Sequence, residues 1–218
     1  THTDIEVILH LYEEHGLDCV RHLRGMFAFA LWDSRQQRLL AARDHLGQKP
    51  FCYARTAGAL FFASEIKALT ADSEVSVEPD FAAIDHYLTW QYVPSPRTAF
   101  QGIHKLPPGH RLICTRAGDL HIEPYWQPPV RMHTPEPTPR QQIGLQEELL
   151  DAIRESVRLH MIADVPLGAF LSGGIDSSLI VAIMAQLSRH PVKTFSIGFE
   201  HDRYNELPFA RRVAQRYH

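Results

Sequence analysis

The sequence SGGIDSS, Ser172 to Ser178, determines how the second half of the chain must fold. It follows the apolar run Val165 to Leu171 and precedes apolar residues at helical spacing from Leu179 to Leu187. The pattern is therefore that of a strand, a tight loop and a helix. Two adjacent glycines allow a positive φ and a close approach of ligand to backbone, and the helix that follows turns its free amides toward the same point. The pattern predicts a loop that holds a phosphate group.

The side chains of this loop fit the same chemistry. The hydroxyls of Ser172, Ser177 and Ser178 can donate to phosphate oxygens, while Asp176 can hold a magnesium ion or cap the helix. A glycine turn with serine caps has the same appearance, and the loop sequence alone leaves that alternative open. No lysine follows the glycines and no third glycine completes GxGxxG, so the loop differs from the two commoner phosphate loops.

Composition limits the class of protein. The chain has 218 residues, of which 44% are hydrophobic and 22% charged, and these values are typical of a globular protein with one or two domains. A net charge of −3 gives no basic surface for nucleic acid, and no apolar run is long enough to span a membrane or to form a signal peptide. We therefore expect a cytoplasmic protein without nucleic-acid or membrane partners. Cys19, Cys52 and Cys114 show no metal or disulfide spacing, and the fourteen histidines form no metal motif.

The first half alternates between helical and strand patterns. A capping box at Thr3 and Glu6 predicts a helix from Asp4 to Glu14, and a short helix is expected at Leu17 to Leu23. Period-2 segments predict an antiparallel meander with helices on both faces. Its strands are Met26 to Asp33, Arg38 to Asp44, Pro50 to Arg55 and Ala59 to Ser64. A helix from Phe81 to Tyr92 precedes two expected hairpins within Ile103 to Trp126, which turn at residues 107–109 and 117–119.

The second half begins after a linker. Gln127 to Pro139 contains five prolines and few large apolar residues. Beyond it we expect an amphipathic helix from Leu145 to Met161, a second strand from Val192 to Phe199 parallel to the first, and a helix from Leu207 to Tyr217 capped by Asn205. Two parallel strands alone leave sheet faces uncovered, so we expect the chain to be part of a longer protein.

The loop resembles SGGxDS, the signature of the N-type ATP pyrophosphatases, which split ATP between its α and β phosphates. Eight segments resemble, in order, the glutamine-hydrolysing asparagine synthetase family. They are TDIEVILHLYEEHG (3–16), LRGMFAFALWD (23–33), ARDHLGQKPFCY (42–53), FFASEIKAL (61–69), KLPPGH (105–110), DVPLGAFLSGGIDSS (164–178), FSIGF (195–199) and YNELPFARRVA (204–214).

The resemblance implies an α+β domain followed by an α/β domain. Residues 1–126 would be the C-terminal part of a class II glutamine amidotransferase domain, an Ntn-type αββα sandwich. Residues 127–140 would be the proline-rich linker, and residues 141–218 the N-terminal part of an ATP-pyrophosphatase domain of the adenine nucleotide alpha hydrolase type. The implied enzyme is a C–N ligase that binds L-glutamine, L-aspartate, ATP and Mg. It would convert aspartate to asparagine through β-aspartyl-AMP, with ammonia from glutamine and release of AMP and pyrophosphate. A homodimer is a candidate assembly.

The resemblance also assigns residues. Asp4 would bind the ammonium group of glutamine, although an acid is also favoured in a helix's first turn. The backbone of Leu171 and Ile197 would contact adenosine, and Asp176 is the candidate magnesium ligand. The pyrophosphate loop would comprise Ser172, Gly173, Gly174, Asp176, Ser177 and Ser178. We interpret Arg43 with Asp44 as a structural pair, and Glu65 with Lys67 as structural or interdomain residues.

Several parts of the family pattern are missing, so no catalytic residue is expected in this chain. The nucleophile of the family is an N-terminal cysteine, and Thr1 lies too close to Asp4 to replace it. The RHRGPD, NGEIYN and SGEGxDE segments are also absent, so we expect the chain alone to be inactive. Alternatives are a β-lactam-synthetase-like ligase or related amidotransferase acting on another carboxylate, a GMP or NAD synthetase, and a non-catalytic nucleotide-binding module. The acceptor is not determined by these residues.

Overall fold

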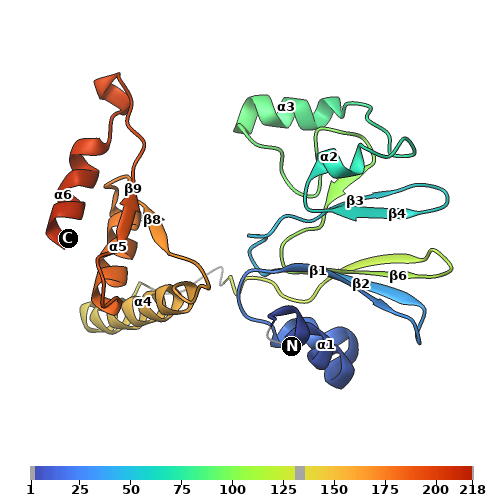
Figure 1. The fold of residues 1–218 in the computed structure, drawn as a ribbon, viewed down its shortest axis with the longest axis horizontal. Coiled ribbons are helices and arrows are strands. Elements are labelled where there is room, and N and C mark those ends of the chain that lie inside the picture. The colour runs from blue at the N-terminus through green and yellow to red at the C-terminus, as the bar shows by residue number, and fades with distance from the viewer. Residues whose placement is uncertain (1–2, 131–135, 218) are drawn as a thin grey trace. The chain divides into compact units, whose positions relative to one another are not determined.

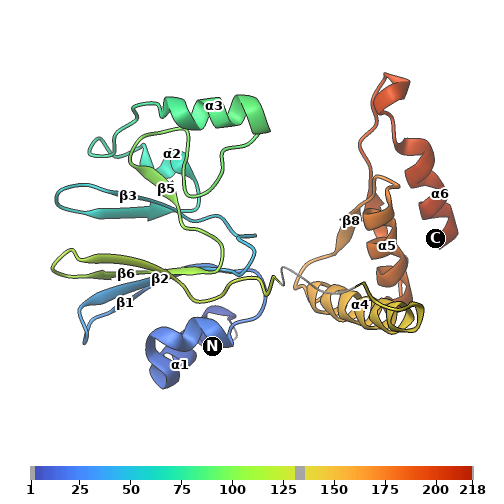
Figure 2. The same ribbon diagram turned by 180° about the vertical axis from the view of Figure 1, so that it is seen from behind.

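The computed structural model describes residues 3–130 and 136–217. Thr1, considered above as a nucleophile, lies outside the described residues. The chain divides into two compact units, Thr1–Val130 and Arg131–His218. Figures 1 and 2 show the helices and strands of each unit from opposite sides.

The first unit contains two antiparallel sheets. The four-stranded sheet has the order β1 (Ala28–Asp33), β2 (Arg38–Arg43), β6 (His110–Thr115) and β7 (Leu120–Pro124). The three-stranded sheet has the order β4 (Leu60–Ala63), β3 (Cys52–Arg55) and β5 (Ile103–Lys105).

The predicted strands are present, but the predicted single meander is wrong. After β2 the chain leaves its sheet, and β3 begins a different sheet, so that the second neighbour of β2 is β6. The predicted hairpin at residues 107–109 is wrong for the same reason, because β5 pairs with β3 while β6 pairs with β2. The second predicted hairpin, β6 with β7, is confirmed, and its turn is closed by a hydrogen bond from Gly118 N to Thr115 O.

Alternating side chains of the strands divide the unit into layers. Leu40 and Ala42 of β2 pack against α1 (Ile5–His15) and the 3₁₀ helix η1 (Gly16–His22), whereas Ala41 faces the second sheet. The core between the two sheets consists of Ala41, Phe51, Tyr53, Leu106 and Leu112. The outer face of the second sheet packs against α2 (Ile66–Leu69). Figure 1 shows α1 on one side of the sheets and α2 and α3 (Phe81–Trp90) on the other, so the expected helical cover is confirmed.

Helix starts in this unit agree closely with expectation. Helix α1 begins at Ile5, one residue after the predicted start, because Asp4 is the N-cap residue; its side chain makes no cap hydrogen bond. Helix α3 begins as predicted at Phe81, where the Asp80 carboxylate accepts a hydrogen bond from Ala83 N.

The second unit contains a parallel strand pair between helices. Its elements are α4 (Pro139–His160), β8 (Gly168–Phe170), α5 (Ile175–Leu187), β9 (Lys193–Phe195), η2 (Asp202–Tyr204) and α6 (Leu207–Tyr217). Strands β8 and β9 are parallel, as predicted, although both are shorter than their apolar runs. Asn205, the predicted cap of α6, lies one residue before the N-cap position: Glu206 O accepts the first helical hydrogen bonds, while Asn205 Oδ1 accepts from Leu207 N at 3.2 Å.

Helix α4 begins well before the predicted Leu145. The cause is a capping box in which Thr138 Oγ1 accepts from Gln141 N and Gln141 Oε1 accepts from Thr138 N, with Pro139 in the first turn. Pro139 and Arg140, which the sequence assigned to the linker, are therefore helical. Residues 131–135 of that predicted linker lie outside the described residues.

Candidate functional site

The glycine pair of the predicted phosphate loop has two different conformations. Gly173 has a φ of +84°, in the region that favours glycine, whereas Gly174 is the N-cap of α5 with an ordinary φ of −68°. The expected positive φ is therefore confirmed for Gly173 only. The loop itself follows the carboxyl end of β8 and ends at the N-terminus of α5, as the sequence predicts.

Gly173 also allows α6 to approach the loop. A Cβ at this position would lie 2.5 Å from Ala210 N and 2.5 Å from the carbonyl carbon of Phe209. Backbone atoms cannot move aside as a flexible side chain can, so only glycine fits. The sequence predicted that this glycine would serve a ligand and did not predict its contact with α6.

The loop serines bind one another. Ser172 Oγ and Ser177 Oγ are 2.9 Å apart, Ser177 Oγ donates to Gly174 O at 3.3 Å, and Gly174 N donates to Ser172 Oγ at 3.3 Å. Both hydroxyl donors are thus satisfied within the loop. A phosphate would have to replace these weak internal bonds, and both the phosphate loop and the serine-capped turn remain consistent with this geometry.

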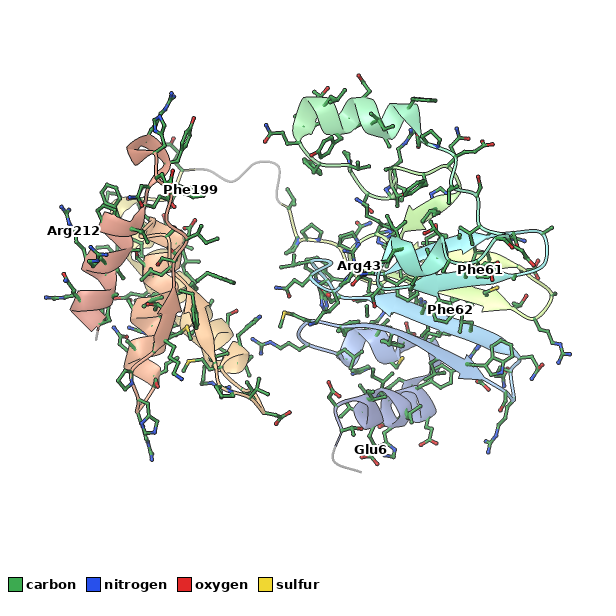
Figure 3. All side chains as sticks on the ribbon, turned by 45° about the horizontal axis from the view of Figure 1, so that its top comes forward. Glu6, Arg43, Phe61, Phe62, Phe199 and Arg212 are labelled. Carbon is green, nitrogen blue, oxygen red and sulfur yellow. The ribbon has the colours of Figure 1, made fainter. Side chains whose placement is uncertain are left out.

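A pocket of about 360 Å³ opens beside the loop. Four of the predicted nucleotide residues line it, namely Leu171, Ser172, Ser177 and Ile197. The remaining lining residues are Phe170, Phe195, Ser196, Phe199, Glu206 and Leu207. Of these, Phe199 is labelled in Figure 3. Sequence reasoning missed this second group. For Phe195, Ser196 and Phe199, the signal in the sequence was the apolar and aromatic composition of the FSIGF segment, which we interpreted as a strand.

Leu171 and Ile197 differ in what they offer a ligand. The Leu171 side chain is only 2% exposed, its N donates to Phe195 O at 2.8 Å, and its O accepts from the Ser196 hydroxyl at 2.6 Å. Its backbone polar groups are therefore already engaged. Ile197 is 71% exposed and offers an apolar surface to the pocket.

Asp176 and Ser178 lie in the first turn of α5, outside the lining of this pocket. Asp176 is exposed, and no group of three or more histidine, cysteine, aspartate or glutamate residues suited to a metal occurs within residues 3–130 and 136–217. A magnesium ion commonly takes only one or two carboxylates and completes its shell with water and substrate phosphate. The single carboxylate of Asp176, in the first turn of α5, fits that requirement.

Asp4 lines a separate and larger pocket of about 760 Å³ in the first unit. The pocket lies between the first turns of α1 and strand β1, and it also includes the cationic residues Arg24 and Lys49. Asp4 makes no cap hydrogen bond in the described structure, so its carboxylate is not committed to holding the helix. The pocket thus combines one anionic and two cationic side chains on a largely apolar wall.

Lys49, which lines that pocket, ends a segment that is held by the buried carboxylate of Asp44. Asp44 is 1% exposed and accepts hydrogen bonds from the amides of Phe27, Leu46, Gln48 and Lys49 at 2.9 to 3.3 Å. Burial alone raises the pKa of Asp44, but these four amides outweigh it and hold the pKa below its ordinary value.

Arg43 binds the same segment through that segment's backbone carbonyl groups. Its guanidinium donates to Lys49 O at 2.7 Å, to Gly47 O at 2.7 Å and to Leu106 O at 2.8 Å. Arg43 and Asp44 are therefore structural residues that bind backbone groups, and no ion pair within the described residues joins them. Glu65 and Lys67 form an exposed ion pair at 2.6 Å.

Comparison with known families gives two matches in order along the chain. Residues 1–126 match the model of the glutamine amidotransferase domain family, and residues 148–218 match that of the asparagine synthase family. In addition, no helix among the described residues is long and apolar enough to cross a membrane.

The curated relatives are longer proteins. The chain is 37% identical over 215 residues to asparagine synthetase [glutamine-hydrolyzing] 1 of Bacillus subtilis, covering 98% of this chain and 33% of that protein. It is 34% identical over 231 residues to amidase chyE of Penicillium rubens, covering 97% of this chain and 33% of that protein. The chain thus spans about a third of the length of these relatives. A solved glutamine PRPP amidotransferase from B. subtilis aligns with 58% of this chain and 23% of its own at 19% identity, with a TM-score of 0.36.

Proposed function

Because the chain belongs, over residues 1–126, to the glutamine amidotransferase domain family, we propose that the complete protein is a glutamine-hydrolysing asparagine synthetase. The observation that carries this proposal is the order of the two family matches, a glutaminase followed by an asparagine synthase, on one chain. The identity of 37% over 98% of this chain to a protein with that name supports it.

In the proposed reaction, a carboxylate oxygen of aspartate attacks the α-phosphorus of ATP, the bond to the β-phosphate oxygen breaks, and pyrophosphate leaves. Ammonia released from glutamine by hydrolysis then attacks the acyl carbon of β-aspartyl-AMP, and AMP leaves with the electron pair of the broken C–O bond. The products are asparagine, glutamate, AMP and pyrophosphate. Activation as an acyl phosphate is needed because a carboxylate does not react with ammonia directly.

We propose that the first unit is the Ntn-type glutaminase and that Asp4 binds the ammonium group of glutamine. The two antiparallel sheets between helices support the fold assignment. The position of Asp4 in a pocket, without a cap hydrogen bond, supports the binding role.

We propose that the second unit is part of an ATP-pyrophosphatase domain. Ser172, Gly173, Gly174, Asp176, Ser177 and Ser178 would receive the phosphates, with Leu171 and Ile197 beside the adenosine. Support comes from the loop's place between β8 and α5 and from the adjoining pocket, whose aromatic lining suits a purine. Asp176 would contribute one oxygen to a magnesium ion, which neutralises charge on the leaving pyrophosphate when it is bound.

Aspartate-dependent pyrophosphate release by the complete protein tests the proposal. With ATP, magnesium and glutamine present, we expect release to require L-aspartate and to match asparagine formation one to one. Release that requires another carboxylate would assign a different acceptor, an outcome that the relative named as an amidase makes worth including. ATP binding without any release would instead indicate a non-catalytic nucleotide module.

A further inference from the structure

A polar pocket of about 270 Å³ lies in the first unit, and the proposed reaction does not use it. One wall is the turn between β3 and β4, residues 56–59, and the other is formed by residues 116–118 of the turn between β6 and β7. These turns and the one between β1 and β2 lie at the same end of the two sheets (Figures 1 and 2). The pocket is therefore formed where the hairpins of two different sheets meet.

Two arginines from different sheets line this pocket. Arg55 ends β3, and its Nη2 lies 3.9 Å from the point that a Cβ on Gly118 would occupy, so its guanidinium reaches the turn of the opposite sheet. Arg116 belongs to that turn, where its Nη1 donates to Gln37 Oε1 at 2.7 Å. Gln37 O also accepts from Arg116 N at 2.9 Å, which fixes the base of the side chain.

The two guanidinium groups have no ion-pair partner among the described residues. Two carboxylates lie near the pocket and keep their negative charge. Glu74 accepts from Thr56 Oγ1 at 3.3 Å and Asp119 from Thr115 Oγ1 at 3.2 Å, and neither forms an ion pair with Arg55 or Arg116. The two guanidinium groups that line the pocket thus keep N–H donors available for a ligand.

We propose that this pocket binds a divalent oxyanion of the phosphate class. A guanidinium offers paired donors in a planar fork that matches two oxygens of such an anion, and two forks match its charge. The site is distinct from the pocket of Asp4. Lys49 and Pro50, which line the Asp4 pocket, precede β3, whereas Arg55 is at the far end of that strand.

A titration of the 218-residue chain with inorganic phosphate tests the proposal. NMR follows the backbone amide signals of the glycines during the titration. Chloride keeps the ionic strength constant. We expect the signals of Gly58 and Gly118 to move and to saturate with phosphate. Signals of Gly173 and Gly174 report separately on the loop of the second unit, so failure of either site is recognised independently. Parallel titrations with pyrophosphate and AMP identify which phosphate source binds most tightly.

Arg55→Gln removes one guanidinium, and we expect the affinity at Gly58 and Gly118 to fall at least about tenfold. Arg35→Gln is the matched control, because Arg35 lies in the β1–β2 turn at the same end of the unit but outside the pocket lining. Equal weakening by both variants would mean general electrostatic attraction and would overturn the proposal, as would the absence of saturation in the unchanged chain. If Arg55→Gln does not fold, Arg55→Lys keeps the charge without the fork and must also bind more weakly.

Discussion

Gly173 meets two requirements at once, a positive φ and a backbone-to-backbone contact with α6. For Gly173→Ala we expect destabilisation of about 2 kcal/mol or more, because the added methyl group is strained at this φ and collides with Phe209 and Ala210. The expected result is a lower urea midpoint for the second unit. Denaturation followed by NMR signals of α5 and α6 measures this.

Gly144→Ala is the control for that substitution. Gly144 lies inside α4, and a Cβ there meets no atom within 4 Å. Because alanine is the better helix former, we expect Gly144→Ala to stabilise the unit by about 0.5 to 1 kcal/mol. A Gly173→Ala protein as stable as the unchanged chain would show that the backbone of α6 does not pack closely against Gly173.

Asp44 makes a pH-dependent contribution to the stability of the first unit. Its pKa is lowered in the folded state, so the stabilisation is present above the unfolded value of about 3.9 and is lost as pH falls through the lower folded value. We expect Asp44→Asn to cost roughly 1 to 3 kcal/mol at pH 7, and the difference from the unchanged chain to shrink below about pH 4.

Urea unfolding of both proteins from pH 7 to pH 3 measures that difference, with Asp85→Asn in α3 as an exposed control. A difference that stays constant over this range would mean that Asp44 acts through its shape alone. Asn keeps one carbonyl oxygen, so part of the hydrogen bonding survives and the variant is expected to fold.

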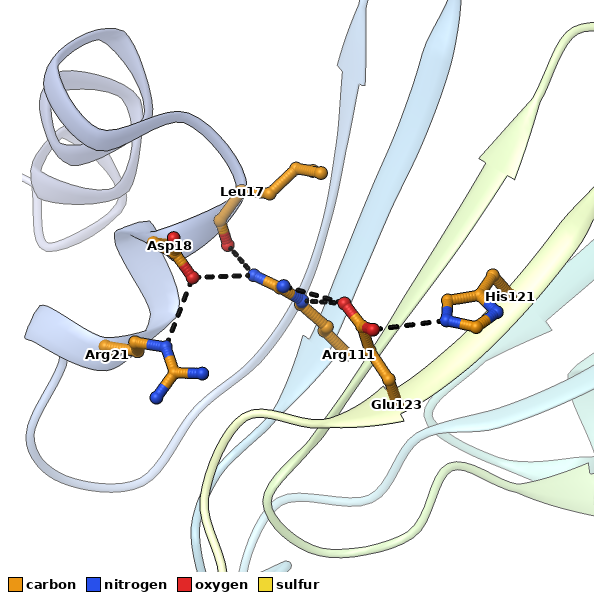
Figure 4. A network of polar contacts seen from close by, with 6 residues as sticks. All are labelled: Leu17, Asp18, Arg21, Arg111, His121 and Glu123. Atoms are coloured by element: carbon orange, nitrogen blue, oxygen red, sulfur yellow. Dashed lines mark hydrogen bonds and ion pairs between the residues drawn. The ribbon is translucent and has the colours of Figure 1, made fainter.

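Arg111 joins three elements of the first unit (Figure 4). Its guanidinium, whose side chain is 13% exposed, donates to Leu17 O at 2.6 Å and pairs with Asp18 at 3.1 Å and Glu123 at 2.6 Å. Hydrogen bonds from Arg111 and then His121 lower the pKa of Glu123. The contacts of Arg111 therefore connect η1 to β6 and β7, at the outer face of the larger sheet.

For Arg111→Lys we expect a loss of about 1 to 3 kcal/mol in unfolding free energy, because an ammonium cannot reproduce a fork that serves several acceptors. Arg21→Lys provides the comparison. Arg21 is exposed and bonds only Asp18 among the described residues, so its replacement is expected to cost less than about 0.5 kcal/mol. Thermal unfolding of the two variants side by side gives the result, and equal losses would refute the central role of Arg111.

Local patterns predicted the elements better than their partners. The short apolar run between Arg38 and Arg43 predicts a strand, because composition over a few residues is a local property. The pairing of β2 with β6 is not local: directly after β2, Asp44 accepts from four amides, and the chain continues into the second sheet. An aspartate before a turn is common in sequences, and nothing in its neighbours indicates how many amides will converge on it.

In the candidate nucleotide pocket, too, the residues of a local motif could be predicted and the residues brought in by tertiary packing could not. Ser172 and Ser177 are recognised because one short motif contains them. Phe199 and Glu206 reach the pocket only because the chain turns back after β9 and α6 packs against Gly173. That packing depends on residues far apart in sequence, so no local pattern could have supplied it.

At the scale of the whole molecule, the two units contain separate candidate sites, one at Asp4 and one at the Ser172–Ser178 loop. If the first supplies ammonia and the second activates the acceptor, added ammonium salts should bypass the first. If the two units have these separate roles, variants in the first unit should affect only glutamine-dependent synthesis, and variants in the second unit should affect synthesis with either nitrogen source.

In the complete protein we expect Asp4→Asn to lower kcat/KM for glutamine roughly ten- to hundredfold, the effect of one lost charged hydrogen bond, while ammonia-dependent synthesis stays unchanged. Ser177→Ala should instead lower synthesis with either nitrogen source, because the loop acts before ammonia does. Asparagine formation, measured with glutamine and with ammonium chloride, distinguishes the two patterns. An Asp4→Asn protein that loses both activities would indicate that Asp4 supports the fold, and one that loses neither would remove Asp4 from the glutamine site.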